Sequence, residues 1–338
     1  MLVSIIVVTV NGLSFLQECL DAIDASSCDN YELLVVDNAS TDGSVEYLKA
    51  WQDGLRKKAV FLDQNYGPCV ARNIGVLNST GDLLAFLDND AAPTSDWLEQ
   101  PLELFKSMPT LGIVQCRLIF KEDSNRIDSE GEYIDCRTGF LVQRVPFGSL
   151  AVSEKQVPDE IFAAKSAGMV VRRSAWDKVD GMDNSFFIYV EETDLAWRIR
   201  DAGYDVYYAP HSIVRHSSGG TSTIPSLNGK RLLRFHGPKN YLLLIIKNSS
   251  TADLPRLLAC QIIAWVGFAC FLFVTFRFQS AFWTAAGVGW VLANPRKAHL
   301  ARCARLERVP RTTALLNRAV ARRVSLTHHI SKAMGYSS

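Results

Sequence analysis

Short apolar stretches alternate with helical patterns along the first 90 residues of the chain. The apolar stretches are rich in Val, Ile and Leu, which is typical of strands that are buried on both faces. Strands that alternate with helices indicate a parallel α/β sheet with right-handed crossovers. The expected strands are residues 3–10, 31–36, 59–62 and 83–87, and the expected helices are residues 15–23, 44–51 and 69–77.

Polar residues follow three of these strands: Asn11, Asp37 and Asp88. Ligands of such sheets bind beyond the carboxyl ends of the strands, so these side chains can converge although they lie far apart in the sequence. Asp88 and Asp90 form a compact pair of carboxylates that suits Mg²⁺ or Mn²⁺ carrying a substrate phosphate. From these residues alone, a polar turn after a strand explains the pair equally well.

A second acidic cluster opens a predicted helix at residues 191–202. On this helix Glu191 and Asp194 share one face, and Glu192 points elsewhere. One interpretation is an acidic first turn that complements the helix dipole; the other is a general base beside a structural acid. Downstream, His216 offers a nitrogen ligand to an oxygen-rich metal site, although a lone His more often has no such role.

Two long apolar runs follow. Residues 257–276 contain no charge and lie between Arg256 and Arg277. A helix of this length spans about 30 Å, the thickness of a bilayer core. The second run, residues 281–293, is too short to span alone. The pair predicts a membrane contact, as one span or as a hairpin that enters and returns; a buried hairpin of a soluble protein is the alternative.

Charge is balanced over the whole chain, with 36 Lys and Arg against 35 Asp and Glu, but residues 295–338 hold ten Lys or Arg and one acid. This basic tail predicts an anionic partner, and its scarcity of aromatic residues favours membrane lipid over nucleic acid. Positive-inside logic places the tail in the cytoplasm, which favours the hairpin. The eight cysteines form no CxxC pair, and no signal peptide is recognisable, so we expect a cytoplasmic catalytic part.

Four segments, in order, resemble motifs of family 2 glycosyltransferases, which have the GT-A fold. They are residues 3–11, 35–44, 87–90 (Leu-Asp-Asn-Asp) and 181–204. The last of them particularly resembles bacterial rhamnosyltransferases and galactofuranosyltransferases. The resemblance covers roughly residues 1–220 and implies a Rossmann-like, mostly parallel sheet with helices on both faces.

The resemblance also implies an activity: inverting, metal-dependent transfer of a sugar, such as a rhamnose-like deoxyhexose or another hexose. The donor is a nucleotide-diphospho-sugar, the acceptor is a hydroxyl of a glycan or polyprenyl-linked molecule, and the setting is cell-surface polysaccharide synthesis. The implied site residues are Thr9, Asn11 and Asp37 around the nucleotide base, Arg72 near base or phosphate, Asp88 at ribose and metal, Asp90 and His216 at the Mn²⁺ or Mg²⁺ ion, Glu192 as general base with Glu191 as the other candidate, and Asp194 as the acid that orients the helix.

Two positions depart from the pattern of the family. Val10 stands where many relatives have Tyr, so stacking on the base is not expected from that position. The acidic pair is Glu191-Glu192, where Glu-Asp or Asp-Asp is usual. Because glutamate is one methylene longer, the choice of base between the two stays open.

Two other functions fit parts of the sequence. A sugar-nucleotide nucleotidyltransferase also uses two nearby aspartates, but it usually has a Gly-rich phosphate loop, and the first loop here is only Asn11-Gly12-Leu13. A non-enzymatic membrane-bound scaffold explains the tail but not the two acidic clusters.

From these patterns we expect four parts, attached to the cytoplasmic face of the cell membrane and without a nucleic-acid partner. They are a catalytic domain over residues 1–225, a connecting helical segment over 226–256, hydrophobic membrane-associated helices over 257–293 and a basic tail over 294–338.

Overall fold

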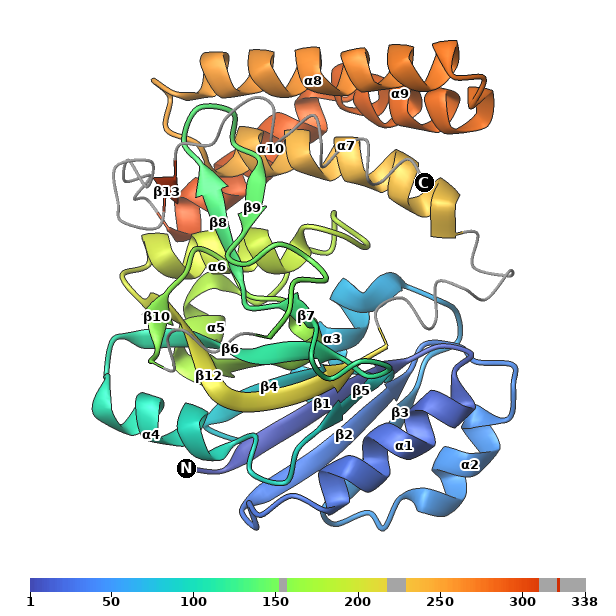
Figure 1. Ribbon diagram of the computed structural model, residues 1–338, viewed down its shortest axis with the longest axis vertical. Coiled ribbons are helices and arrows are strands. Elements are labelled where there is room, and N and C mark those ends of the chain that lie inside the picture. Colours follow the sequence, from blue (N-terminus) through green and yellow to red (C-terminus); the bar gives the residue numbers. More distant parts are fainter. Residues whose placement is uncertain (152–156, 218–228, 310–320, 323–338) are drawn as a thin grey trace. The chain divides into compact units, whose positions relative to one another are not determined.

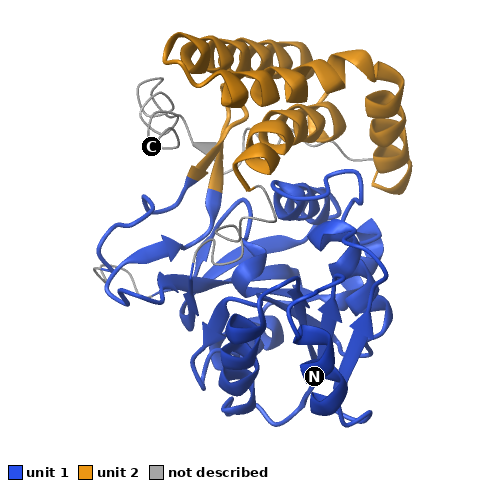
Figure 2. Cartoon of the chain, turned by 90° about the vertical axis from the view of Figure 1, so that its right-hand side faces the viewer, with its two compact units in different colours: residues 1–132, 143–228 blue, residues 133–142, 229–338 orange. Residues whose placement is uncertain are grey.

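The computed structural model describes residues 1–151, 157–217, 229–309 and 321–322. The chain divides into two compact units, which Figure 2 colours separately. Residues 1–132 and 143–228 form the sheet unit, and residues 133–142 and 229–338 form the helical unit. Most of the expected basic tail, residues 310–320 and 323–338, lies outside the described residues.

The first half of the sheet unit is parallel (Figure 1). Its strands lie in the order β3-β2-β1-β4, and each pair is parallel. The strands follow the apolar runs closely. The clearest case is β2, in which every residue is buried. The elements are β1 (Val3–Thr9), α1 (Leu13–Asp24), β2 (Tyr31–Asp37), α2 (Ser44–Trp51), β3 (Lys57–Phe61), α3 (Gly67–Leu77) and β4 (Leu83–Asp88).

The second half of the sheet is mixed. One strand, β11, runs antiparallel between β4 and β6, while β12 is parallel to β6. The expected parallel α/β sheet is therefore confirmed for the first half and extended by an antiparallel insertion. The elements are β5 (Ala91–Pro93), α4 (Glu99–Ser107), β6 (Leu111–Phe120), β7 (Ile127–Ser129), β10 (Asp159–Glu160), β11 (Met169–Arg172), α5 (Arg173–Val179), α6 (Glu191–Asp201) and β12 (Asp205–His216).

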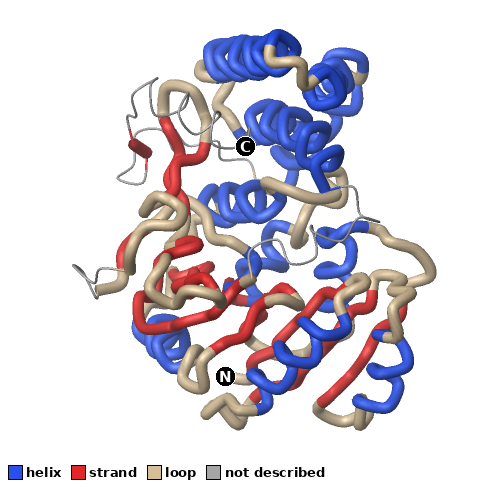
Figure 3. The backbone as a smooth tube through the Cα atoms, turned by 45° about the vertical axis from the view of Figure 1, so that its right-hand side comes forward, coloured by secondary structure: helices blue, strands red, loops and turns tan. Residues whose placement is uncertain are grey.

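Helices cover both faces of this sheet, as expected (Figure 3). On one face, Val3, Ile5 and Val7 of β1 pack into a buried cluster with Leu16 and other apolar residues of α1. On the other face α3 approaches so closely that a Cβ atom on Gly75 would lie 2.6 Å from the Ile6 side chain. The alternation along β1 thus fixes α1 and α3 on opposite sides.

The described residues of the helical unit form four helices and a small sheet. Helix α7 packs against α9, and α8 packs against both. Three strands, β13-β8-β9, form the small sheet, in which β13 runs parallel to β8. The elements are β8 (Glu132–Asp135), β9 (Leu141–Gln143), α7 (Gly229–Asn248), α8 (Leu254–Val274), α9 (Phe278–Ala293), α10 (Pro295–Arg308) and β13 (Ala321–Arg322).

Candidate active site

The carboxyl ends of three parallel strands meet at one edge of the sheet. Thr9 at the end of β1 lies beside Asp37 at the end of β2, and Val8 lies beside Asp88 at the end of β4. Asn89 ties this edge together, because its amide donates to the Thr9 hydroxyl over 3.0 Å. Asn89 thus links the loop after β4 to the end of β1.

Asp88, Asp90 and His216 form a cluster that can hold a metal ion, since one ligand atom from each lies within 4.8 Å of the others. His216 reaches the cluster because the end of β12 pairs with β5, which places His216 opposite Ala91. Its Nε2 atom lies 3.2 Å from Oδ1 of Asp90. Two carboxylates and an imidazole are donors that suit Mn²⁺ or Mg²⁺, and the nitrogen ligand suits Mn²⁺ better.

Asp128 on β7 completes the surroundings of His216. Its Oδ2 atom lies 2.7 Å from Nδ1 of the imidazole. Burial opposes the charged form of His216, but hydrogen bonds with Asp128 and Asp90 outweigh it and raise the pKa to about 10. These carboxylates thus attract positive charge, and His216 must lose the proton from Nε2 to bind a metal ion. Asp128 stands in a polar stretch with weak periodicity, so no sequence pattern singled it out.

Arg72 on α3 links the two acidic clusters. Its guanidinium lies 2.8 Å from Oδ1 of Asp88 and 3.1 Å from Oε1 of Glu191, and the residue is only 4% exposed. The resemblance placed Arg72 near base or phosphate. In the structure the guanidinium forms ion pairs with two carboxylates, so Arg72 positions Asp88 and the start of α6 relative to each other.

A strained turn sets the position of the acidic pair. Phe187, Tyr189 and Val190 have φ angles of 66°, 70° and 71°, which non-glycine residues rarely adopt. The turn packs tightly on the start of α3, where a Cβ atom on Gly67 would lie 2.7 Å from the Phe187 ring. The Cys69 thiol donates to the Phe187 carbonyl over 3.3 Å. Packing against α3 therefore holds the backbone that leads into α6.

The two glutamates of the pair differ in their surroundings. Glu191 is buried and paired with Arg72. Glu192 is partly exposed and makes no ion pair with the described residues. Burial, followed by the charge of Glu191, raises the pKa of Glu192 well above its usual value, against the opposing charge of Lys165. Glu192 is thus partly exposed, although its Oε2 atom is covered, and it is the carboxylate of the pair whose pKa is raised.

Asp194 has a structural environment. The residue is fully buried, and its Oδ2 atom lies 2.7 Å from Nε of Arg198, one turn further along α6. Arg198 in turn donates to the carbonyl of Val179 at the end of α5 over 2.8 Å. This chain of contacts fixes α6 against α5.

The residues expected around the base shape the loop after β2. Oδ1 of Asn11 accepts from the backbone N–H of Thr41 over 2.6 Å, and Oδ1 of Asp37 accepts from that of Ser40 over 2.9 Å. The second oxygen, Oδ2 of Asp37, is buried without a hydrogen bond to the described residues. Asn11 also borders an open groove of about 420 Å³ that Asp42 lines from the other side.

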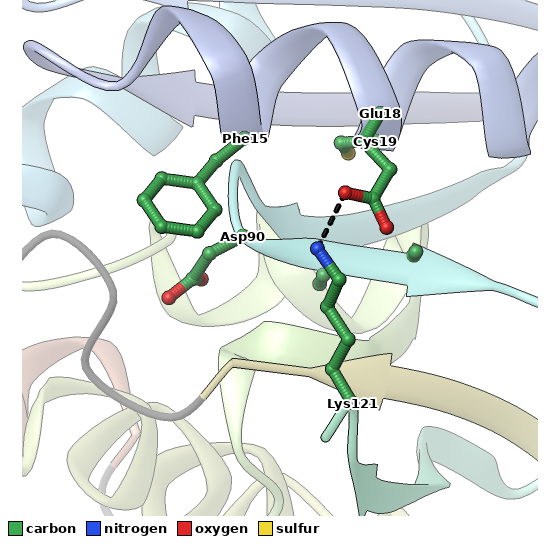
Figure 4. A pocket seen from close by; sticks show the side chains of 7 residues that line it. Phe15, Glu18, Cys19, Asp90 and Lys121 are labelled. Atoms are coloured by element: carbon green, nitrogen blue, oxygen red, sulfur yellow. Dashed lines mark hydrogen bonds and ion pairs between the residues drawn. The ribbon is translucent and has the colours of Figure 1, made fainter.

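Asp90 faces a narrow crevice beside α1 (Figure 4). The ring of Phe15 lies next to Asp90, and Cys19 also lines the crevice. An ion pair between Lys121 and Glu18 closes one side. Sequence reasoning missed this pair, because neither residue belongs to a recognisable motif.

Comparisons with known proteins agree on one family. The model of the family described as "Glycosyl transferase family 2" matches residues 4–177, about half of the chain. The chain is 28% identical over 217 residues to glycosyltransferase AglE of Haloferax volcanii, covering 63% of this chain and 65% of that protein. The chain thus spans just under two thirds of the length of this relative.

Two solved structures share the fold. One is GalNAc-T7 with UDP, GalNAc and Mn²⁺, at a TM-score of 0.54 and 18% identity, covering 72% of this chain and 50% of that chain. The other is the mannosyltransferase PcManGT of Pyrobaculum calidifontis with GDP-Man and Mn²⁺, at a TM-score of 0.51 and 17% identity, covering 94% and 88%. At these identities the likeness concerns the fold.

Proposed function

The chain belongs to glycosyl transferase family 2, and we propose that it moves a sugar from a nucleotide-diphospho-sugar to a hydroxyl of a glycan or polyprenyl-linked acceptor. The observation that carries the proposal is one edge of the sheet. It brings Asp88, Asp90 and His216 together and, through Arg72, ties them to the helix that presents Glu192. The match to the family model confirms the expected family, and the likeness to solved structures confirms the expected GT-A type of fold.

Asp88, Asp90 and His216 would hold a divalent cation, Mn²⁺ or Mg²⁺. Their donor atoms fit such an ion in kind and spacing, and Asp128 fixes the orientation of the imidazole. A bound cation would supply positive charge to the leaving diphosphate. Both GalNAc-T7 and PcManGT were solved with Mn²⁺, which supports this choice of cofactor.

Glu192 is our choice for the general base. It takes the proton of the acceptor hydroxyl while the oxygen forms its bond to the anomeric carbon. The bond from that carbon to the diphosphate oxygen breaks, and the diphosphate leaves with the electron pair. Attack from the face opposite the leaving group gives inversion. Glu191 is engaged by Arg72, so it is less suited to act as base or as nucleophile.

The nucleotide would bind beside Thr9, Asn11 and Asp37. Oδ2 of Asp37 needs a hydrogen-bond donor, and the ring N–H of uracil, thymine or guanine offers one. We retain a rhamnose-like deoxyhexose or another hexose as the donor sugar and cell-surface polysaccharide as the product, because residues 181–204 resemble rhamnosyltransferases.

We place the enzyme on the cytoplasmic face of a membrane, where a polyprenyl-linked acceptor is within reach. The support is the apolar helix α8, whose length and composition are sufficient to cross a membrane, and the basic residues that follow α9. The rival nucleotidyltransferase reading has no support from the family match, and a scaffold has no need of the Asp88–Asp90–His216 cluster.

A transfer assay tests the proposal. Full-length protein is incubated with Mn²⁺, a panel of UDP-, dTDP- and GDP-sugars and a detergent extract of polyprenyl-linked glycans. We expect transfer from one donor, and a loss of at least about 100-fold for Glu192→Gln, which removes the base. We expect a similar loss for Asp90→Ala, which removes a metal ligand.

Asp96→Asn, a change of an exposed acid outside the cluster, serves as the matched control and should transfer normally. Circular dichroism verifies that all variants are folded. Turnover near that of the wild type in either Glu192→Gln or Asp90→Ala would refute the assignment of that residue.

A further inference from the structure

Two helices of the helical unit each expose an apolar stripe, and we call the two stripes together the outer face. Its residues recur every three or four positions, so they lie along one side of each helix. Four of them are large side chains with exposed fractions of 60–72%: Ile263, Phe273, Phe282 and Leu292. The outer face consists of Ala259, Ile263, Val266, Cys270 and Phe273 of α8 and Phe278, Phe282, Ala285, Gly289 and Leu292 of α9.

The opposite side of α9 is covered by α7. The two helices approach so closely that a Cβ atom on Gly287 would lie 2.3 Å from the carbonyl oxygen of Phe235. Helix α7 carries buried polar residues, among them Lys239, Asn240 and Lys247. If lipid surrounded α9 on all sides, these polar groups would enter the bilayer core with it, which is unfavourable.

The lengths of the two helices also argue against a hairpin that crosses the bilayer. Helix α8 has 21 residues and a length of about 31 Å. Helix α9 has 16 residues and a length of about 24 Å, which is shorter than the hydrocarbon core of about 30 Å. Among the described residues, only α8 is both long enough and apolar enough to cross a membrane.

Positive charges outnumber negative ones in this unit, which favours an anionic partner. Residues 229–308 contain 12 Lys or Arg and two acids, Asp253 and Glu307. Arg256 lies in the first turn of α8, Arg277 lies directly before α9, and Lys297 lies shortly after α9. A second copy of the chain on the outer face would bring the same positive charges together, whereas anionic lipid head groups would neutralise them.

Cations also stack on the aromatic residues of these helices. The guanidinium of Arg231 lies 4.1 Å from the ring centre of Trp283. Lys239 and Lys297 lie 5.1 Å and 5.8 Å from that of Trp290. Tryptophan and basic side chains at one level are typical of the boundary between lipid and water.

We propose that α8 and α9 lie flat in the surface of an anionic bilayer, with the outer face against the acyl chains and α7 on the aqueous side. The arrangement replaces both expected alternatives, a single span and a re-entrant hairpin, with a monotopic contact. It deepens the membrane part of the proposed function and rests on that proposal for its biological setting.

Vesicle binding tests the surface. Full-length protein is sedimented with phosphatidylcholine vesicles that contain or lack phosphatidylglycerol. We expect binding to the anionic vesicles and a loss of about tenfold or more in the double variant Ile263→Ser/Phe282→Ser, because both side chains lose their burial in lipid. The matched control, Leu55→Ser/Leu77→Ser, changes two side chains of the sheet unit that are 83% and 84% exposed.

The control should bind vesicles as the wild type does. If the Ile263→Ser/Phe282→Ser variant also binds like the wild type, the outer face is not the contact. Hydrolysis of the donor is measured on the same samples. A double variant that hydrolyses donor but does not bind supports both proposals, while a wild type that binds but neither hydrolyses nor transfers refutes the enzyme alone.

Depth measurements separate a flat contact from a crossing. A fluorophore is attached in turn at Ala259→Cys, Val266→Cys and Ala285→Cys, with the exposed Cys270 and Cys303 replaced by Ser. Lipids brominated at different acyl positions then report the depth by quenching. We expect one shallow depth for all three sites. A gradient along α8 that reaches the bilayer centre at Val266 would overturn the proposal.

Discussion

At the residue scale, the site depends on how neighbouring carboxylates are made different. Arg72 forms ion pairs with Asp88 and Glu191, whereas Glu192 makes none with the described residues. From the sequence, the resemblance favours Glu192 as the base, and Glu191 remains possible. In the structure the two differ in burial and in the ion pair that Glu191 makes with Arg72, a residue of a distant helix, and no spacing in the sequence predicts that contact.

The raised pKa of Glu192 predicts how the rate depends on pH. A general base acts only when deprotonated, so kcat/KM should rise with pH, with a midpoint well above the usual glutamate value of about 4.3. Glu191→Gln removes a like charge from beside Glu192 and should move this midpoint down. A pH–rate profile checks both; a midpoint at the ordinary value in the wild type contradicts the assignment.

Asp128 is predicted to act as a positioning residue for His216. Asp128→Asn should weaken Mn²⁺ binding about 10- to 100-fold, because the imidazole loses the carboxylate that orients it. Calorimetric titration with MnCl₂ measures the affinity, and ¹⁵N NMR of the His216 ring reports its tautomer. Asp123→Asn, an exposed acid of the same segment, is the control. Unchanged affinity and unchanged ring shifts would show that Asp128 has no such role.

At the element scale, the apolar runs predict the strands well because burial on both faces leaves a continuous signal. Strand β11 is harder to place, since an antiparallel strand of four residues reads like any short apolar run. The same limit applies to the turn before α6. Its left-handed residues Phe187, Tyr189 and Val190 have no sequence signature, because glycine would be the expected residue type at such angles.

A buried hydrogen-bond cluster joins strands at the edge of the sheet opposite the site. Glu32 accepts from the Ser4 hydroxyl and from the backbone N–H of Thr80, and it pairs with Lys58. Burial alone would raise the pKa of Glu32, but these hydrogen bonds outweigh it and lower the pKa to about 2. Glu32 therefore stabilises the fold in its charged form.

This cluster predicts a loss of stability in acid. The contribution of Glu32 is complete above its unfolded pKa of about 4.3 and disappears as pH falls through the folded value of about 2, a change of about 3 kcal/mol. Urea unfolding at several pH values should show the difference between wild type and Glu32→Gln shrinking over this range. Glu46→Gln, an exposed control, should show no such change. A constant difference for Glu32→Gln would contradict the account.

At the scale of the whole molecule, the sequence predicts four parts in order along the chain, and the structure has two compact units, with residues 133–142 joined to the helical one. Length and absence of charge suggested a span or hairpin at residues 257–276. The cover of α9 by α7 is what led us to propose a flat membrane contact instead, because it leaves the other side of α9 exposed. Such a cover is a tertiary contact between helices whose sequences do not reveal it.

The site, too, could be predicted from the sequence only in part. The strand pattern predicted that Asn11, Asp37 and Asp88 lie at one edge of the sheet, since parallel strands end at a common edge. His216 arrives by antiparallel pairing with β5, and Asp128 by a short strand beside β6. Contacts that depend on such pairings require the folded chain.

Binding of Mn²⁺ together with a nucleoside diphosphate tests the central claim most directly. MnCl₂ is titrated into full-length protein with UDP, dTDP or GDP present, and the bound ion is counted by electron paramagnetic resonance. We predict one equivalent of Mn²⁺ with the matching nucleotide, lost in Asp90→Ala and retained in Glu192→Gln. Equal Mn²⁺ binding by Asp90→Ala and the wild type would contradict the account.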